Sequence, residues 1–322
     1  MIHTESIPRE GMEAFSEDFQ IVGKSLSMQK VYRFIHKVKD INAPVFISGE
    51  SGTGKELVAR NIHLMGTRRK ENFVALNCGA IPENLLESEL FGYRRGSFTG
   101  ALRDKQGLIE EADKGILFLD EICDLSPMLQ SKLLRVLQEK ELRRIGENRP
   151  RPVDIKVISA TNKDIEKEVE KERFREDLYY RLKIISIKLP PLKDRGCDIL
   201  CLLEYFTQKF NKEMNLKKLR FSSEALDFLL HYSWPGNVRE LKNTIERAII
   251  FSKDKKISEK DLNIFENEMN SEKNIKFKNL TLKEVEKEYI KQVLKEMNGN
   301  KTKAAKRLGI SIQTLYNKLK EF

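Results

Sequence analysis

The stretch "PVFISGESGTGKE", residues 44–56, decides the fold of this chain. It places the pattern G-x-x-x-x-G-K between a short apolar run and a segment with helical periodicity. In that context the glycines let backbone N–H groups surround phosphates, and the helix N-terminus adds its positive pole. A lysine at this spacing, here Lys55, reaches the β- and γ-phosphates of a nucleotide. The stretch therefore predicts a phosphate-binding loop with the contact residues Gly49, Glu50, Ser51, Gly52, Thr53, Gly54, Lys55 and Glu56.

Further apolar runs of strand length predict a parallel sheet. They are almost continuously apolar, as strands buried on both faces of a sheet are. Helical stretches alternate with them, among them Ser27–Asp40 and a helix at Ser126, an N-cap followed by proline at the first helical position. This alternation predicts an α/β domain with a mostly parallel sheet. The runs are Pro44–Ser48, Phe73–Asn77, Ile116–Asp120, Ile155–Ala160 and Ile184–Leu189.

An acidic pair follows one of these runs, in "ILFLDE" at residues 116–121. The pair lies at the carboxyl edge of the predicted sheet, where open α/β sheets bind their ligands. Asp120 suits the coordination of Mg²⁺, directly or through water, and Glu121 can polarise an attacking water as a general base. The alternative is an acidic pair that only caps the following segment. With the phosphate loop upstream, the pair predicts nucleotide hydrolysis, although Glu56 stands where other such loops place a Ser or Thr ligand for Mg²⁺.

Basic charge is concentrated near the C-terminal end. The sequence carries 59 Lys and Arg against 49 Asp and Glu, a net charge of +10, and residues 301–320 contain basic residues but no acid. A phosphate backbone selects a field of one sign. In the same segment Ala305, Gly309 and Leu315 have the spacing of a helix-turn-helix. The segment therefore predicts a DNA-binding module, and the alternative is a basic helical hairpin that contacts protein.

The second helix of this module would present the DNA-contacting side chains. We expect Ser311 to cap that helix, and Ile312, Leu315 and Leu319 to face inward. The side chains then left for base or phosphate contact, together with the capping serine, are Ser311, Gln313, Thr314, Asn317 and Lys318.

The sequence lacks membrane and export features. No apolar run approaches the ~20 residues of a membrane-spanning helix, and the N-terminus has no basic start followed by an apolar stretch. We therefore expect a cytoplasmic protein without a membrane partner. About 20 residues precede Ile21, which is too few for another domain. Control would then come from a partner protein in trans, or a regulatory domain has been lost or removed.

Six motifs in order resemble the AAA+ domain of bacterial enhancer-binding proteins, the activators of sigma-54 RNA polymerase. They are "GESGTGKE", "ELFGYRRGSFTGA", "GILFLDE", "FREDLYYRL", "LPPLKDR" and "WPGNVREL". The resemblance covers Ile21 to Phe251, and the C-terminal region is similar to the Fis-type domain of these activators. In that family the phosphate loop commonly ends in Lys-Glu, as it does at Lys55 and Glu56.

The resemblance implies an ATP-hydrolysing, DNA-bound activator that remodels the closed promoter complex of the sigma-54 RNA polymerase holoenzyme. It implies ATP and Mg²⁺ as cofactors and double-stranded DNA at an upstream activator site. It also implies self-assembly, to a dimer through the helix Thr281–Met297 and to a hexameric ring, which arginine fingers acting in trans require. One alternative is a sigma-54-independent DNA-binding regulator of the same fold, which tends to lose the loop kept here at residues 96–101. Another is an AAA+ unfoldase or clamp loader, which would not need the Fis-like tail.

The resemblance also assigns roles around the nucleotide. Asn77 matches the residue that holds the catalytic glutamate in an inactive orientation, although an Asn at a strand end also caps turns. Asp120 and Glu121 keep the roles given above. The base-packing segment matches Ile21, Val22 and Gly23. The sensors near the γ-phosphate match Thr161, Asn162 and, in the lid, Arg239. Two arginine fingers that act on the neighbouring subunit's nucleotide match Arg175 and Arg181.

The loop "GSFTGA" resembles the element that touches sigma-54 in this family, with serine in place of one alanine. Glycines at both ends permit hinge motion, and Phe98 supplies an apolar anchor for a partner pocket. The alternative is that Phe98 packs on its own domain. The predicted contact residues are Gly96, Ser97, Phe98, Thr99, Gly100 and Ala101.

These features together predict the domain organisation. An AAA+ parallel sheet with a phosphate loop is followed by a helical lid and then by a small all-α helix-turn-helix domain. The predicted segments are an N-terminal extension, 1–20; the α/β ATPase subdomain, 21–190; the lid, 191–265; a linker, 266–280; and the DNA-binding domain, 281–322.

Overall fold

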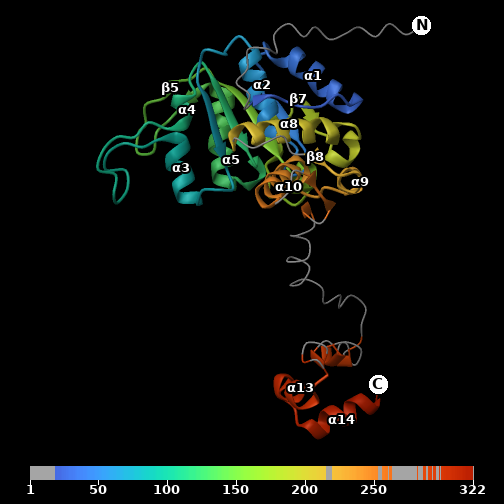
Figure 1. The fold of residues 1–322 in the computed structure, drawn as a ribbon. Helices are drawn as coiled ribbons and strands as arrows, with labels where there is room; N and C mark the ends of the chain where they lie inside the picture. Colours follow the sequence, from blue (N-terminus) through green and yellow to red (C-terminus); the bar gives the residue numbers. More distant parts are fainter. Residues whose placement is uncertain are drawn as a thin grey trace, which may run out of the picture. The chain divides into compact units, whose positions relative to one another are not determined.

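The computed structural model describes residues 19–214, 220–252, 256–259, 261–262, 281, 286–287, 289–291, 293–294, 297 and 299–321. The chain forms two compact units, Met1–Leu262 and Asn263–Phe322 (Figure 1). The first unit holds the predicted sheet and lid, and the second holds the predicted DNA-binding helices. The predicted linker and residues 1–18 of the predicted extension lie outside the described residues.

A five-stranded parallel sheet forms the centre of the first unit. Its order is β2-β3-β6-β1-β7, and each neighbouring pair is parallel. This confirms the predicted α/β class. Because all strands run in one direction, their carboxyl ends share one edge of the sheet. The strands are β1 Val45–Ser48, β2 Phe73–Asn77, β3 Ile116–Asp120, β6 Lys156–Thr161 and β7 Ile185–Lys188.

Helices cover both faces of this sheet, which explains why the strands are apolar throughout. In β3, Leu117 belongs to a core cluster with residues of α3, α5 and α7, whereas the adjacent Phe118 belongs to a cluster with residues of α1 and α2. Successive strand residues point to opposite faces, so each face buries its own set. The helices are α1 Leu26–Val38, α2 Lys55–Met65, α3 Glu83–Phe91, α4 Leu108–Glu111, α5 Pro127–Glu139, α6 Ile165–Glu170 and α7 Glu176–Leu182.

Ser126 occupies the N-cap position of α5, with proline at the start of the helix, as predicted. Its hydroxyl makes no capping hydrogen bond, however. The remaining short elements of this subdomain are a 3₁₀ turn, Ile122–Asp124, and a small antiparallel pair, β4 Glu141–Leu142 and β5 Arg151–Pro152.

The lid is helical and has a core of its own. Trp234 is 2% exposed and donates its indole N–H to Leu229 O at 2.9 Å, so its one polar atom is satisfied inside this core. Phe206 of α8 and Leu241 of α10 belong to the same cluster. The elements are a 3₁₀ turn Leu192–Arg195, α8 Asp198–Glu213, β8 Arg220–Phe221, α9 Ser223–His231, α10 Asn237–Phe251 and β9 Lys256–Ile257.

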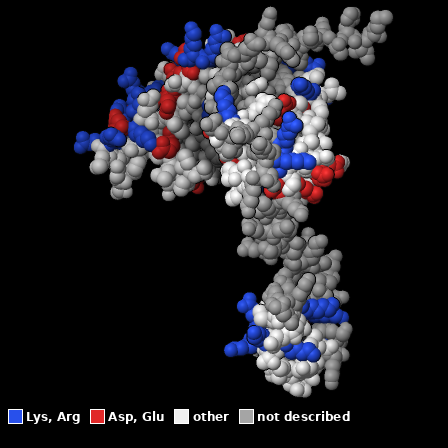
Figure 2. Space-filling model, viewed as in Figure 1, with Lys and Arg blue, Asp and Glu red and all other residues white. Residues whose placement is uncertain are grey.

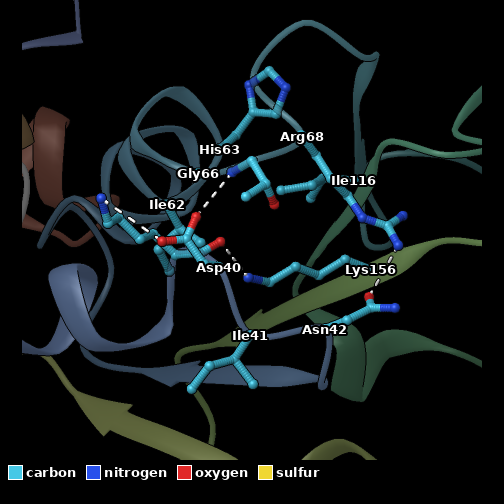
Figure 3. Close-up of a pocket in the computed structure, with 11 residues that line it drawn as sticks. Asp40, Ile41, Asn42, Ile62, His63, Gly66, Arg68, Ile116 and Lys156 are labelled. Atoms are coloured by element: carbon cyan, nitrogen blue, oxygen red, sulfur yellow. Dashed lines mark hydrogen bonds and ion pairs between the residues drawn. The ribbon is translucent and has the colours of Figure 1, made fainter.

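A buried lysine lies at the edge of the sheet opposite the phosphate loop (Figure 3). Lys156 begins β6, and its Nζ donates to Val38 O at 2.8 Å and to Lys39 O at 3.1 Å, the carbonyls at the end of α1. Burial lowers the pKa of Lys156 to about 8. The cavity beside it has a volume of about 30 Å³, which is space for a water rather than a ligand. We therefore assign this edge a structural role.

The second unit contains the predicted helix-turn-helix, α13 Lys301–Leu308 and α14 Ile312–Glu321. Gly309 takes the turn with φ 67°, and the side chains of Ala305 and Leu315 are buried, as the spacing predicted. Both pack with Ile290 and Val293 from the preceding segment. Of the predicted dimer helix Thr281–Met297, only some residues are described; most of its first turns lie outside the described residues.

Candidate functional site

A cavity of about 690 Å³ lies at the carboxyl edge of the sheet, where the lid approaches the phosphate loop. Its size suits a nucleotide. One end is lined by Phe19, Ile21 and Val22 and by lid side chains such as Tyr205 and Phe206. The other end is lined by the turns and side chains that the sequence assigned to phosphate chemistry, namely Ser51, Gly52, Thr53, Gly54, Lys55, Glu56, Asn77, Asp120, Glu121 and Arg239.

The phosphate loop joins β1 to α2 and is held by its own polar groups. Lys55 begins α2, is 6% exposed, and donates from Nζ to Gly49 O at 3.0 Å. The hydroxyl of Thr53 donates to Glu50 O at 2.8 Å. Gly54, with φ 98°, is the N-cap residue of α2, so the helix N-terminus opens directly onto the loop. The loop thus joins a strand to a helix N-terminus with Lys55 at the first helical position, and its binding of phosphate stays a prediction.

The acidic pair lies beside Lys55, at the end of β3. Glu121 has a left-handed backbone, with φ 51°. Its Oε1 lies 3.8 Å from Lys55 Nζ, and its Oε2 accepts a hydrogen bond of 3.1 Å from the N–H of Asn162. Asp120 Oδ1 accepts from the N–H of Glu121 at 3.0 Å. Glu121 therefore lies next to the loop lysine, and Asp120 lines the same cavity beside it.

The strand ends next to this pair carry the remaining polar residues predicted on the sheet. Asn77 is in register with Asp120 and lines the cavity, but its Oδ1 accepts from the N–H of Gly79 at 2.9 Å. The side chain thus caps its own turn in this structure, one of the two roles considered for it. Thr161 is buried and its O accepts from the N–H of Gly49 at 3.2 Å. Asn162 reaches the site through its backbone N–H.

Among the described residues, three lid side chains form hydrogen bonds with the phosphate loop, and sequence reasoning identified one of them. Arg239 donates from Nη1 to Ser51 Oγ at 3.0 Å. Asn237, which is fully buried, donates from Nδ2 to Glu50 Oε2 at 3.1 Å and to Ser51 O at 3.0 Å. Arg195 donates to Thr53 O at 2.8 Å. Asn237 and Arg195 stand in the quoted motifs "WPGNVREL" and "LPPLKDR", so the motifs carried the signal although the residues were not singled out.

The two predicted arginine fingers lie away from this cavity. Arg175 pairs with Asp177 and donates to Ser131 Oγ at 3.1 Å. Arg181 donates to Leu137 O at 3.0 Å and lines a different cavity, of about 260 Å³. In the described part of the chain neither guanidinium is brought to the phosphate loop of its own subunit.

The loop at residues 96–101 projects from the subdomain beside α3 and α4 (Figure 1). Phe98 is 45% exposed, and one edge of its ring packs on Tyr93 with the ring centroids 4.9 Å apart. Phe98 thus contacts its own domain and still presents part of its ring to solvent. Ala101 is buried, whereas Leu102 is 84% exposed. A partly exposed aromatic ring and an exposed leucine on a projecting loop suit contact with a partner.

The predicted DNA-contacting residues of α14 differ in their availability. Ser311 Oγ accepts from the N–H of Thr314 at 3.0 Å, the predicted cap, and Gln313 and Asn317 are exposed. Two expectations were wrong. Ile312 is 42% exposed and does not face inward, whereas Ile310 before it and Leu315 after it belong to the packed cluster. Lys318 is not free, because its Nζ pairs with Glu286 Oε1 at 2.6 Å. Lys and Arg gather on the face of this unit shown in Figure 2.

The sequence matches three described families along its length. Residues 21–188 match "Sigma-54 interaction domain", residues 193–278 match "AAA+ ATPase lid domain", and residues 281–322 match "Bacterial regulatory protein, Fis family". Within the part of the chain that the structure describes, no helix has the length and apolar character needed to cross a membrane.

Similar proteins cover nearly the whole chain. It is 46% identical to the transcriptional regulatory protein ZraR of Escherichia coli (strain K12), over 99% of this chain and 72% of ZraR. It is 43% identical to the response regulator protein PilR of Pseudomonas aeruginosa, over 94% of this chain and 70% of PilR. Among solved structures, NtrX from Brucella abortus in complex with ADP matches with 33% identity and a TM-score of 0.74, over 94% of this chain and 69% of NtrX.

Proposed function

The chain belongs to the sigma-54 interaction domain family and is an ATP-dependent, DNA-binding transcription activator of sigma-54 RNA polymerase, and we propose the following roles for its residues. The observation that carries the proposal is the grouping of Lys55, Asp120 and Glu121 at one end of the cavity, with Lys55 Nζ 3.8 Å from Glu121 Oε1. ATP is the substrate, and its phosphates occupy this end.

Each group of the site then has a chemical task. Lys55 and the loop N–H groups bind the β- and γ-phosphates, and Glu121 takes the proton of the attacking water. The N–H of Asn162 holds Glu121, and Arg239 holds the loop from the lid. Ile21 and Val22 pack the base, with Gly23 completing the segment. Asn77 restrains Glu121 when its side chain turns from Gly79 toward the carboxylate.

Mg²⁺ fits the donor set at this end of the cavity. No cluster of three or more His, Cys, Asp or Glu is placed to hold a metal in the described residues. Mg²⁺ in nucleotide sites is usually held by one or two carboxylates together with phosphates and water. Asp120 would supply that carboxylate, and the ion would neutralise phosphate charge. A site with one suitable carboxylate beside a phosphate loop therefore matches the chemistry of this ion.

A ring of subunits is proposed from the position of the arginines. Arg175 and Arg181 lie away from their own cavity, so they can act on phosphate only in a neighbouring subunit, as trans fingers would. Mixing Arg181→Ala with Lys55→Ala subunits should then restore part of the ATPase rate, because each supplies what the other lacks. No recovery in rings shown to be mixed would contradict this arrangement.

The tail and the projecting loop make the contacts outside the ATPase. In α14, Ser311, Gln313, Thr314 and Asn317 would face the major groove of double-stranded DNA, and Lys318 would do so after leaving Glu286. Such an activator works in the cytoplasm, where the promoter and polymerase are. The loop Gly96–Ala101 would touch sigma-54 and couple the nucleotide state to promoter opening, with Phe98 as its apolar anchor.

A separation of functions tests the role of the loop. Phe98→Ala should hydrolyse ATP near the parental rate, because Phe98 lies outside the nucleotide cavity. It should fail to bind sigma-54 in the presence of a transition-state analogue and fail to open a sigma-54 promoter in vitro. Thr99→Ala should behave likewise if its hydroxyl bonds across the interface. Normal promoter opening by Phe98→Ala would show that the loop does not have this role.

A further inference from the structure

The segment that enters the lid, "LPPLKDRGCDI" at residues 189–199, contains two buried side chains of the charged residue types, Arg195 and Asp198. Arg195 is 3% exposed and Asp198 is 0% exposed. Buried charges are costly unless hydrogen bonds and opposite charge compensate them. The two charges lie close enough to stabilise each other, and their hydrogen bonds run to different segments: those of Asp198 to Lys24 and Ser25, those of Arg195 to Pro190 and the phosphate loop. None of the functions above uses Asp198.

Asp198 binds the start of the segment that lines the base end. Its Oδ1 accepts from Lys24 N at 2.6 Å and from Ser25 N at 2.8 Å, and its Oδ2 accepts from Ser25 Oγ at 2.6 Å. All three donors come from residues more than 170 positions away in sequence. A Cβ on Gly23 would lie 2.8 Å from Asp198 Oδ2. The segment is therefore fitted closely against the first turn of α8.

Tyr32 holds the same segment from the other side. Its hydroxyl lies 3.1 Å from both Ile21 O and Gly23 O, where it can donate to either carbonyl. Burial, and next the nearby Asp198 carboxylate, raise the pKa of Tyr32 to about 12, so the phenol keeps the proton it donates. Ile21 and Val22 are thus presented to the cavity by a backbone fixed between α1 and α8.

Arg195 contacts the other end of the cavity. Its Nη2 donates to Thr53 O in the phosphate loop at 2.8 Å and to Pro190 O at 2.9 Å. Pro190 follows β7 by two residues, so the guanidinium links the phosphate loop to the connection between sheet and lid. Arg195 and Asp198 are only three positions apart in the sequence, yet one contacts the phosphate loop and the other contacts the segment that carries Ile21 and Val22.

We propose that Asp198 is a positioning residue for nucleoside recognition, and that Arg195 positions the phosphate loop. The inference rests on the proposed nucleotide site. Without Asp198 the segment 21–25 loses three acceptor contacts on the side of α8, whereas the phosphate loop keeps all of its own hydrogen bonds. The two halves of one ligand should therefore respond differently to the loss of this carboxylate.

The experiment compares a non-hydrolysable ATP analogue, AMP-PNP, with inorganic tripolyphosphate, each titrated calorimetrically into the full chain with Mg²⁺. Asp198→Ala should weaken AMP-PNP binding by about tenfold or more, since hydrogen bonds to a charged group are lost. Tripolyphosphate binding should change by less than about twofold, because the ligand has no base. In steady-state assays the KM for ATP should rise with little change in kcat.

The conservative variant distinguishes positioning from simple loss of stability. In Asp198→Asn, Oδ1 can still accept from both backbone N–H groups while the amide donates to Ser25 Oγ. This variant should recover most of the AMP-PNP affinity. Tyr32→Phe removes the hydroxyl on the other side of the segment and should also weaken AMP-PNP alone. Arg195→Lys should weaken both ligands by the same factor, because it acts at the phosphate loop.

Asp194→Ala is the matched control, since this exposed carboxylate lies four positions earlier in the same segment and should change neither affinity. Equal weakening of both ligands by Asp198→Ala, or of neither, would overturn the inference. If Asp198→Ala does not fold, Tyr32→Phe and Ser25→Ala decide the question by the same comparison. A parental chain that binds neither ligand would instead refute the proposed nucleotide site.

Discussion

The phosphate loop and the projecting loop both contain glycines with positive φ, yet their surroundings differ. Gly52 has φ 77° and Gly96 has φ 82°, so both positions have the same left-handed backbone conformation, which favours glycine. A Cβ on Gly52 would lie 2.3 Å from Gly236 O and 3.0 Å from Arg239 Cβ, both in the lid. A Cβ on Gly96 or Gly100 would meet nothing within 4 Å.

The difference shows what fixes each loop. The phosphate loop is confined from outside, because lid residues reach its carbonyls at Ser51 and Thr53. The projecting loop is held mainly by its own short bonds, such as Gly96 N to Ala101 O at 2.9 Å, and by its base. A loop that must keep one geometry for chemistry has neighbours on every side, whereas a loop that meets a partner leaves its tip open.

The largest effects on ATP hydrolysis are expected at the phosphate loop and the glutamate beside it. Lys55→Ala should abolish ATP hydrolysis by removing the cation that binds the phosphates. Glu121→Gln should retain ATP binding and lower turnover by about 10²–10⁴-fold, since it removes only the general base. Equilibrium binding of AMP-PNP and single-turnover ATPase assays separate the two outcomes.

Glu56→Gln is a useful comparison for these variants, because Glu56 also lines the cavity but its carboxylate pairs with Arg60, with 2.7 Å between Arg60 Nη2 and Glu56 Oε1, and not with Lys55. It should change turnover much less than Glu121→Gln does. Hydrolysis by Glu121→Gln at the parental rate would mean that another group activates the water, and the role given to the β3 carboxylates would have to be reassigned.

An alanine at each glycine tests the comparison directly. Gly52→Ala should destabilise the first unit by about 2–4 kcal/mol, because the left-handed backbone and the overlap with Gly236 O both oppose it. Gly96→Ala should lower the free energy of unfolding by about 1 kcal/mol, because only the left-handed backbone opposes the new methyl group. Urea unfolding measures both, and AMP-PNP affinity should fall for Gly52→Ala only. Equal losses for the two variants would show that the lid does not confine the phosphate loop.

The sheet could be predicted well from the sequence, because each strand is recognised from its own run of apolar residues. Strand ends fall within one residue of the predicted runs, since strands buried on both faces are apolar and end where polar residues begin. Lys55, Asp120 and Glu121 were also predictable, because a parallel sheet brings the residues after its strands to one edge.

The lid contacts could not be predicted in the same way. Asp198 and Ser25 meet across 173 positions, and Asn237 and Glu50 across 187, so their pairing depends on how the lid folds back on the sheet. Ile312 and Lys318 were misassigned for a related reason. Helical spacing gives the face of a side chain, but it does not say where packing ends or that Glu286 lies within reach.

The smallest effect is expected at Ser97, the residue by which the projecting loop departs from the family pattern. Ser97 Oγ is buried, and Ser97 packs against the loop between β4 and β5, where a Cβ on Gly146 would lie 2.6 Å from Ser97 Cβ. In the described residues this hydroxyl has no hydrogen-bond partner. A buried hydroxyl without a partner costs free energy that a methyl group avoids. Ser97→Ala should therefore stabilise the first unit by up to about 1 kcal/mol in urea unfolding and leave ATP hydrolysis unchanged. Sigma-54 binding should be equal to or stronger than that of the parent, because the side chain faces the base of the loop rather than its tip. A clear loss of sigma-54 binding would show instead that the hydroxyl contacts the partner. The projecting loop would then be as closely surrounded in its complex as the phosphate loop is in the free chain.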